Sequence, residues 1–458
     1  MSWQQSDKTE LPTAVVLTFG CKVNQYDSNA MRSTMVRNGY QIVPETEPAD
    51  VCLINTCTVT NIADQKARKI IRRVVKRNPE AKVLVTGCYA ESDRQQIEQI
   101  EGVSLVFGNR EKADLDQYLE YLSLQTHQPT SGLLQITPVQ HDAIREHANF
   151  GLSVSDTGDR TRGIIKVQDG CSAFCTYCII PYVRGRMTSR PISEIVTEVE
   201  EIAASGAKEI VITGVHLGSY GIDRQNEQLP KDGRVSIADI LEQIHPVDGI
   251  ERIRLSSIEP MNFPEDLAPT MAELPKCMPH FHLPLQAGSD RTLKRMRRRY
   301  TTDEFSKLTE HLRSVFPDAG LTTDIMVGFP GETDRDFEDS LRFVEQIGFS
   351  QLHVFRYSPR RGTPAAEYPD QLAPHISADR SQRMIVSGQR SSQTFRQQMV
   401  GKEAKVLIED LRHGDLLMGS TGNYLRTAID VPDSQINQVI PVTLTGVENG
   451  IMLAIPQS

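Results

Sequence analysis

The segment 170–178 holds three cysteines, Cys171, Cys175 and Cys178, separated by three and two residues. Thiolates this close together repel one another unless a metal holds them, and Cys sulfur is a preferred ligand of zinc and of iron–sulfur clusters. A closed zinc site takes four protein ligands, and no other Cys or His lies near this loop. A 4Fe–4S cluster can be held by three thiolates with one iron left open. The loop therefore predicts such a cluster; a zinc site completed by a distant residue, or a disulfide-prone loop, remains the alternative.

A second set of three cysteines follows three predicted strands in the N-terminal third. Short apolar runs typical of buried parallel strands occur at 14–17, 51–54 and 82–85. A cysteine follows each of them in turn: Cys21, Cys57 and Cys88. Ligands of open α/β sheets bind outside the carboxyl ends of the strands, so these thiols should converge into a second three-thiolate site. Three ordinary core cysteines are the alternative, because free Cys is often buried.

The elements around these thiols predict a doubly wound parallel α/β domain over residues 11–125. A fourth strand is expected at 103–107, and helical patterns at 25–36 and 61–76 separate the strands. A short helix is plausible at 111–121. The two cysteines outside these sets, Cys52 and Cys277, are expected to be structural.

The central residues 162–398 predict a partial (β/α)6 barrel, preceded by a polar, turn-rich linker at 126–161. Six apolar runs alternate with helical stretches, at 164–167, 209–215, 252–256, 281–285, 322–327 and 351–357. Thr333 and Asp336 form a possible capping box for a helix that Gly348 ends. Barrel enzymes carry their chemistry at the carboxyl ends of the strands, and the strand ends here are polar and glycine-rich.

The last residues, 399–458, predict a small β-barrel of the kind that binds oligonucleotides, because five short strand patterns follow one another. Residues 401–458 contain four Lys/Arg against seven Asp/Glu, so this module is acidic. Its affinity for nucleic acid would then rest on a few cations.

Length and composition indicate about three domains in a chain of 458 residues. Eight cysteines without a signal peptide suit a reducing cytoplasm, and no apolar run approaches the roughly 18 residues of a membrane span. We therefore expect a soluble cytoplasmic protein. The net charge is −9, yet seven Lys/Arg fall within 66–77 and six within 291–299. A single basic run is usually a solvated helix face, but two in an acidic chain favour a docking surface for an anionic partner.

The Cys-x3-Cys-x2-Cys spacing, with Tyr177 before the last Cys, resembles the signature of the radical S-adenosylmethionine (SAM) enzymes. The segments 20–28, 55–60 and 86–88 further resemble the N-terminal motifs of the radical SAM methylthiotransferases, and the likeness covers essentially the whole chain. It implies two 4Fe–4S clusters, one on each cysteine set, two SAM molecules per turnover, and a TRAM domain at the C-terminus that helps bind tRNA.

The resemblance also implies roles for particular residues. Thr213 and Gly214 would take the amino acid part of SAM, Ser257 or Glu259 would hydrogen-bond its polar atoms, and the segment from Met326 to Gly328 would face adenine. Tyr177 is expected in the same pocket, whereas His216 and His282 could equally serve packing or substrate positioning. The residues expected to contact tRNA are Arg297, Arg298, Arg299, Lys405 and Arg426, with Arg412 and Tyr424 as further candidates.

The motifs after Cys21 and Cys57 most resemble the type that adds a methylthio group to C2 of N6-threonylcarbamoyladenosine at tRNA position 37, beside the anticodon. The alternatives are the type acting on N6-isopentenyladenosine and the type acting on a ribosomal-protein aspartate. A non-enzymatic electron-transfer or RNA-binding protein is the rival class, but neither role needs a glycine-rich cofactor pocket. The expected partners are the tRNA anticodon loop and an electron donor such as flavodoxin or ferredoxin, with the chain a monomer and no membrane association.

Overall fold

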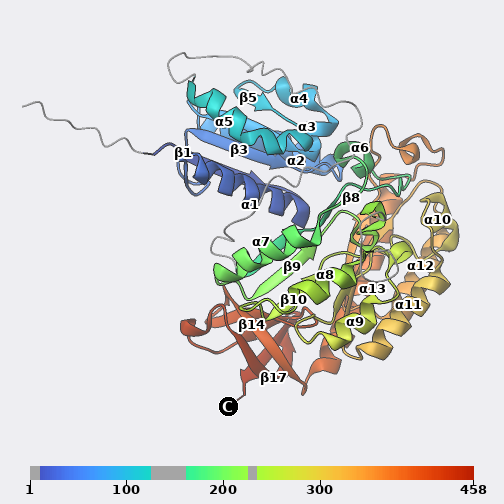
Figure 1. The fold of residues 1–458 in the computed structure, drawn as a ribbon. Coiled ribbons are helices and arrows are strands. Elements are labelled where there is room, and N and C mark those ends of the chain that lie inside the picture. Colours follow the sequence, from blue (N-terminus) through green and yellow to red (C-terminus); the bar gives the residue numbers. More distant parts are fainter. Residues whose placement is uncertain (1–10, 125–160, 225–234, 458) are drawn as a thin grey trace, which may run out of the picture. The chain divides into compact units, whose positions relative to one another are not determined.

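The computed structural model describes residues 11–124, 161–224 and 235–457 (Figure 1). These residues form two compact units. Unit 1 contains 11–124 together with Tyr182–Gly185, and unit 2 contains the other described residues. Apart from its last residue, the predicted linker 126–161 lies outside the described residues.

Unit 1 is built on a five-stranded parallel sheet in the order β2-β1-β3-β4-β5. Its strands are β1 (Thr13–Thr18), β2 (Gln41–Ile42), β3 (Val51–Thr56), β4 (Lys82–Gly87) and β5 (Val103–Val106). Its helical elements are α1 (Lys22–Arg37), α2 (Asn61–Arg77), α3 (Cys88–Ser92), α4 (Arg94–Glu98), η1 (Arg110–Asp114) and α5 (Leu115–Leu124). The predicted doubly wound fold is confirmed. Strand β2 was not predicted, because two residues carry no readable apolar pattern.

The barrel of unit 2 has six parallel strands in two three-stranded sheets, β10-β9-β6 and β11-β12-β13. They are β6 (Arg162–Lys166), β9 (Glu209–Thr213), β10 (Arg252–Leu255), β11 (His280–His282), β12 (Gly320–Val327) and β13 (Gln351–Arg356). Single bridges from Ile253 to Cys277 and from Ser257 to His282 join the two sheets. A short antiparallel pair, β7 (Gln168–Asp169) and β8 (Thr188–Ser189), flanks the first cysteine loop. The predicted partial (β/α)6 barrel is confirmed.

Helices follow the barrel strands, as the sequence pattern indicated. They are α6 (Ile180–Arg184), whose last residues belong to unit 1, α7 (Ile192–Ala204), α8 (Ile237–Ile244), α9 (Leu267–Glu273), α10 (Asp290–Arg295), α11 (Thr302–Val315), α12 (Asp334–Ile347) and α13 (Pro374–Met399), with short 3-10 turns η2 (Leu217–Ser219), η3 (Ile222–Arg224), η4 (Pro260–Asn262) and η5 (Pro364–Glu367). The capping box predicted for α12 is present, since Thr333 and Asp336 cap each other's backbone N–H. Gly348 ends this helix in the left-handed region, at φ 65°.

The C-terminal part of unit 2 is a closed five-stranded barrel in the order β14-β15-β16-β18-β17. Its elements are β14 (Glu403–His413), β15 (Leu416–Thr421), β16 (Arg426–Ile429), η6 (Asp433–Gln435), β17 (Val439–Glu448) and β18 (Ile451–Pro456). Its interior is filled by aliphatic side chains such as Val406, Leu417 and Val442, all 0% exposed. The predicted small β-barrel is therefore confirmed as a fold.

A buried charge cluster joins the two barrels of unit 2 at the amino ends of β6, β9 and β10. Glu209 is fully buried, and it pairs with Arg162 at 3.2 Å, Arg252 at 2.8 Å and Arg254 at 3.0 Å. Arg252 also donates to the carbonyls of Ser420 and Thr421, and Arg254 donates to that of Gly422. The carboxylate thus orients the cations that bind the C-terminal barrel.

Both cysteines expected to be structural are buried, Cys52 at 0% and Cys277 at 5% exposure. In the part of the chain that the structure describes, none of the helices is long and apolar enough to cross a membrane.

Candidate active site

The first cysteine loop follows β7, and hydrogen bonds from a buried glutamine fix the backbone at its start. The side-chain amide of Gln168 donates to the carbonyls of Asp169 and Gly170, at 2.8 Å each, while its oxygen accepts from the backbone N–H of His216 at 2.7 Å. Phe174 lies at φ 49°, an uncommon conformation for a residue other than glycine. The loop thus follows a path that its own residues do not favour, which is common where a backbone must wrap a ligand.

Nitrogen atoms of an arginine and a histidine lie close to two of the thiols in this loop. A guanidinium nitrogen of Arg298 lies 3.6 Å from Cys175 Sγ, and His216 Nδ1 lies 3.6 Å from Cys171 Sγ. Burial, with smaller contributions from Cys175 and Glu259, raises the pKa of Cys171 to about 11. Burial likewise raises the pKa of Cys178 well above its usual value. These thiols stay protonated at neutral pH until a metal replaces the proton, as expected of cluster ligands.

Arg298 lies inside the site, which corrects the prediction that it contacts tRNA phosphates. It is 7% exposed, pairs with Glu259 and donates to the carbonyl of Pro284 at 3.1 Å. Its guanidinium also stacks on Tyr300, 5.0 Å from the ring centroid. Arg297 lies in the left-handed region at φ 58°, and both it and Arg299 are exposed on either side of the buried Arg298. Arg298 therefore supports the cysteine loop and Glu259.

The residues expected to bind SAM lie at the carboxyl ends of the barrel strands. Thr213 ends β9 and Gly214 follows it, while Met326 and Gly328 lie at the end of β12. A Cβ at Gly214 would come within 2.9 Å of Gln168 Oε1, so only glycine permits this approach to the cysteine loop. Ser257 and Glu259 follow β10, and Tyr177 packs edge-on against Phe329. The barrel thus brings all seven predicted SAM residues to one end.

The composition of this end fits a cluster with SAM. Three thiols are enough to hold a 4Fe–4S cluster with one iron left open for SAM. His216 Nε2 is buried with no hydrogen-bond partner among the described residues, a polar atom that a bound ligand could satisfy. His282 instead interacts with Thr322 at 2.9 Å and Asp324 at 3.3 Å.

The second cysteine set lies at the carboxyl ends of β1, β3 and β4 in unit 1. The order in which the chain adds strands to the sheet reverses between β1 and β3. Doubly wound folds bind their ligands at this switch point. A Cβ at Gly20 would lie 2.7 Å from Cys57 Sγ, so the turn that carries Cys21 packs tightly on Cys57. Burial, reinforced by Cys88 and Cys21, raises the pKa of Cys57 to about 11. The three predicted thiols therefore gather at one edge of the sheet.

Among the described residues, no group of three or more His, Cys, Asp or Glu side chains is arranged to hold a single metal ion. A 4Fe–4S cluster does not require that arrangement, because its thiolates bind different irons. Each donor set consists of three cysteines, and Cys sulfur is a preferred ligand of iron–sulfur clusters.

The other residues expected to contact tRNA divide into exposed and paired cations. Arg297, Arg299 and Lys405 are exposed. Arg426 pairs with Glu409 at 2.9 Å, and Arg412 pairs with Asp433. Tyr424 lies beneath the guanidinium of Arg254, 4.6 Å from the ring centroid, and so belongs to the junction between the two barrels.

Replacing Arg298 with lysine is expected to weaken the first site, because one ammonium cannot span Cys175, Glu259 and Pro284 as the planar guanidinium does. Changes to residues that support metal ligands typically cost about 10- to 100-fold in metal affinity or activity. Iron content and SAM affinity of the anaerobically reconstituted protein measure the effect. Arg342→Lys, on the exposed side of α12, is the matched control. Unchanged iron and SAM binding in Arg298→Lys would contradict this role.

Comparisons with known proteins agree with this geometry. Residues 165–344 match the Radical SAM superfamily, and residues 13–108 match the family described as Uncharacterized protein family UPF0004. The chain is 34% identical over 439 residues to the threonylcarbamoyladenosine tRNA methylthiotransferase MtaB of Bacillus subtilis, covering 95% of this chain and 94% of that protein. It is 36% identical over 441 residues to the tRNA-2-methylthio-N(6)-dimethylallyladenosine synthase of Pelotomaculum thermopropionicum, covering 94% of each.

Among solved structures, the radical SAM methyltransferase TsrM from Kitasatospora setae matches with a TM-score of 0.56 and 16% identity, over 78% of this chain and 77% of TsrM. This likeness supports the fold. Membership of the radical SAM superfamily implies a 4Fe–4S cluster and SAM binding. The sequence relatives, which match almost end to end, place the chain among the radical SAM methylthiotransferases, as an enzyme of the MtaB type.

Proposed function

We propose that this enzyme adds a methylthio group to C2 of N6-threonylcarbamoyladenosine at tRNA position 37. The observation that carries the proposal is the pair of three-cysteine sites, one in each unit. Radical SAM chemistry alone needs only Cys171, Cys175 and Cys178. A second set at the ligand-binding edge of another sheet supports sulfur insertion, because that reaction also needs a place to hold the incoming sulfur.

Each site has a separate task in this proposal. When bound, the cluster and SAM at the first site supply a radical that removes the hydrogen from an unactivated carbon, which acid–base groups cannot do. Thr213 and Glu259 would hold SAM, and Arg298 keeps Glu259 and the cysteine loop in place. Cys21, Cys57 and Cys88 would hold the second 4Fe–4S cluster, which would supply the place where the incoming sulfur receives its methyl group from another SAM. Reduction requires an external donor, for which flavodoxin or ferredoxin remains our prediction.

Two surfaces are suited to bind tRNA phosphates. On α2, the exposed side chains of Lys66, Lys69, Arg72 and Lys76 form one stripe, and none of the four makes an ion pair with another described residue. A helix rises about 1.5 Å per residue, so the stripe is about 15 Å long. In unit 2, Arg297 and Arg299 are exposed beside Arg298, which the first site contains. The unit 2 pair therefore adjoins, in the sequence, a residue of the first site.

Replacing both Arg297 and Arg299 with serine is expected to weaken tRNA binding and to reduce its salt dependence. Each phosphate contact with single-stranded nucleic acid contributes about 0.7 to the slope of log K against log salt, so loss of two contacts lowers the slope by about 1.4. Titrations of an anticodon stem-loop at several salt concentrations measure both quantities. The control replaces Arg342 and Arg383, which are exposed but paired with Asp339 and Glu338. An unchanged slope would show that the unit 2 pair is a solvated surface only.

Nucleoside mass spectrometry of tRNA from a deletion strain tests the substrate. We expect loss of the 2-methylthio derivative of N6-threonylcarbamoyladenosine and its return on complementation. The second candidate is N6-isopentenyladenosine, also called the dimethylallyl derivative, because one close relative is named for it. Loss of that derivative instead would replace our assignment, and no change in tRNA would leave the ribosomal-protein aspartate as the substrate to test.

A further inference from the structure

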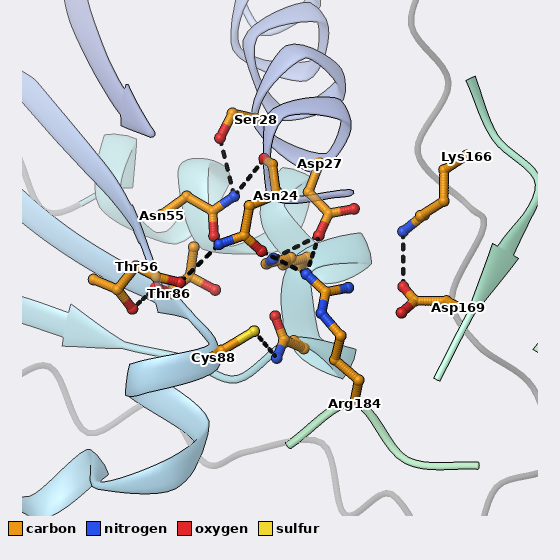
Figure 2. Close-up of polar contacts among 12 residues, drawn as sticks. Asn24, Asp27, Ser28, Asn55, Thr56, Thr86, Cys88, Lys166, Asp169 and Arg184 are labelled. Carbon is orange, nitrogen blue, oxygen red and sulfur yellow. Dashed lines mark hydrogen bonds and ion pairs between the residues drawn. The ribbon is translucent and has the colours of Figure 1, made fainter. Parts of the chain in front are cut away.

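A buried network of charged side chains lies beside the second cysteine set in unit 1. The Asp27 carboxylate accepts from Lys112 Nζ at 2.7 Å and from Arg184 at 3.2 Å, and the three side chains are at most 3% exposed. Figure 2 shows Arg184 directed toward both Asp27 and Asn24. Arg184 follows the first cysteine loop in the sequence, yet its segment, Tyr182–Gly185, belongs to unit 1. The network therefore assembles three distant stretches of the chain.

Asn24 connects this network to the turns that carry the thiols. Its side-chain amide donates to the carbonyls of Phe19 and Thr56, at 2.8 Å each. Phe19 lies two residues before Cys21, and Thr56 immediately precedes Cys57. The side-chain oxygen of Asn24 accepts from Arg184 (Figure 2). Asn24 therefore links the charged network by hydrogen bonds to the turns that carry Cys21 and Cys57.

The two cations act electrostatically on the thiols themselves. Burial lowers the pKa of Lys112, but attraction by Asp27, whose carboxylate lies 2.7 Å from Nζ, and by Cys88 opposes this and favours the charged form. Arg184 in turn lowers the pKa of Cys57, against the larger effect of burial. Buried charges keep much of their strength, because little water lies between them to screen the field. A cluster bound by thiolates gains negative charge when it is reduced, so a nearby buried cation favours the reduced form and a nearby carboxylate opposes it.

We propose that Lys112 and Asp27 set the reduction potential of the cluster held by Cys21, Cys57 and Cys88, with Lys112 raising it and Asp27 lowering it. Arg184 and Asn24 fix the distance of this pair from the thiols. The inference rests on the proposed function, which assigns the second cluster to these cysteines. Both residues are positioning residues, since they act on the cluster through space and not as ligands.

The test uses the full-length chain with Cys171, Cys175 and Cys178 all replaced by alanine, so that only the second site can bind a cluster. After anaerobic reconstitution, iron content is measured and the cluster is titrated electrochemically with detection by electron paramagnetic resonance. Lys112→Met is expected to lower the ratio of reduced to oxidised cluster about tenfold at a fixed solution potential, a shift of about 59 mV for one electron. Asp27→Asn is expected to shift the potential in the opposite direction, and Lys112→Arg to leave it unchanged.

The matched control is Lys82→Met, which removes the same charge at the amino end of β4, the end away from Cys88. Equal potentials in Lys112→Met, Asp27→Asn and Lys82→Met would overturn the inference. So would loss of the cluster from both variants with the circular dichroism spectrum retained, because the network would then serve binding alone. The protein that carries only the three alanine replacements, with Lys112 and Asp27 intact, should bind about four irons per chain. If it does not, the second cluster of the proposed function is contradicted instead.

Discussion

Replacing Cys178 with alanine is expected to abolish SAM cleavage by the reduced enzyme, whereas replacing Cys57 should leave cleavage intact and stop methylthiolation. Cys178 supplies one of the three thiols of the first site, and an iron that loses its protein ligand cannot be held in the arrangement that binds SAM. Cys57 belongs to unit 1, and Cys178 to unit 2. The measurement is 5′-deoxyadenosine release with dithionite as reductant, followed by analysis of the modified nucleoside.

Two buried cysteines provide the control for this prediction. Cys52→Ala and Cys277→Ala each remove a thiol from the core of one unit, so both activities should persist in them. Cys171→Ala and Cys175→Ala should behave as Cys178→Ala does. If Cys57→Ala also lost SAM cleavage while keeping its fold, the two sites would not have separate tasks, and the proposed division between radical formation and sulfur supply would be wrong.

Glu209→Gln is expected to destabilise unit 2 by about 3–5 kcal/mol, because it leaves the buried arginines Arg252 and Arg254 without their shared carboxylate. Glu209 holds Arg252 and Arg254 in the orientations that bind the carbonyls of Ser420, Thr421 and Gly422. Denaturant unfolding, followed separately by far-ultraviolet circular dichroism and by limited proteolysis, should show the C-terminal barrel releasing first. Asp303→Asn, which breaks an exposed pair with Lys307, should leave the unfolding midpoint close to that of the wild type, because water screens exposed ion pairs.

The difference in unfolding free energy between the wild type and Glu209→Gln should also depend on pH. Burial alone would raise the pKa of Glu209, but attraction by Arg254, Arg252 and Arg162 outweighs it and lowers the pKa from 4.5 to about 2. A carboxylate with a depressed pKa in the folded state stabilises the fold fully above its unfolded value and loses this contribution as the pH falls. The advantage of the wild type over Glu209→Gln should therefore be constant above about pH 5 and shrink between pH 4.5 and pH 2. A difference that stays constant over this range would contradict a charged Glu209.

Much of the chemistry was predictable because it depends on local spacing and on one rule of sheet geometry. The spacing of Cys171, Cys175 and Cys178 identifies the first site without any structure. Cys21, Cys57 and Cys88 each follow a predicted strand, and the carboxyl ends of neighbouring parallel strands meet at one edge. The same rule brought Thr213 and Gly328 to one end of the barrel. These predictions required only that the strands be recognised.

The direction of individual side chains was not predictable in the same way. Arg298 stands in a run of three arginines, and the sequence treats them alike. In the structure Arg298 is buried against Glu259, Cys175 and Pro284, while Arg297 and Arg299 are exposed. Tyr424 looked like a contact for RNA, but it packs beneath Arg254. In both places a contact between distant residues decides whether a cation or a ring faces solvent.

By itself the sequence determined the family, the two cysteine sets and the order of the domains, since each depends on residue types at short, fixed separations. Only the tertiary structure showed that Lys112 and Arg184 both contact Asp27. These two residues lie 85 and 157 positions away from Asp27 along the chain. It also gathered three arginines around Glu209. Buried charges are stable only beside an opposite charge, and the fold, not the spacing, decides which distant charges meet.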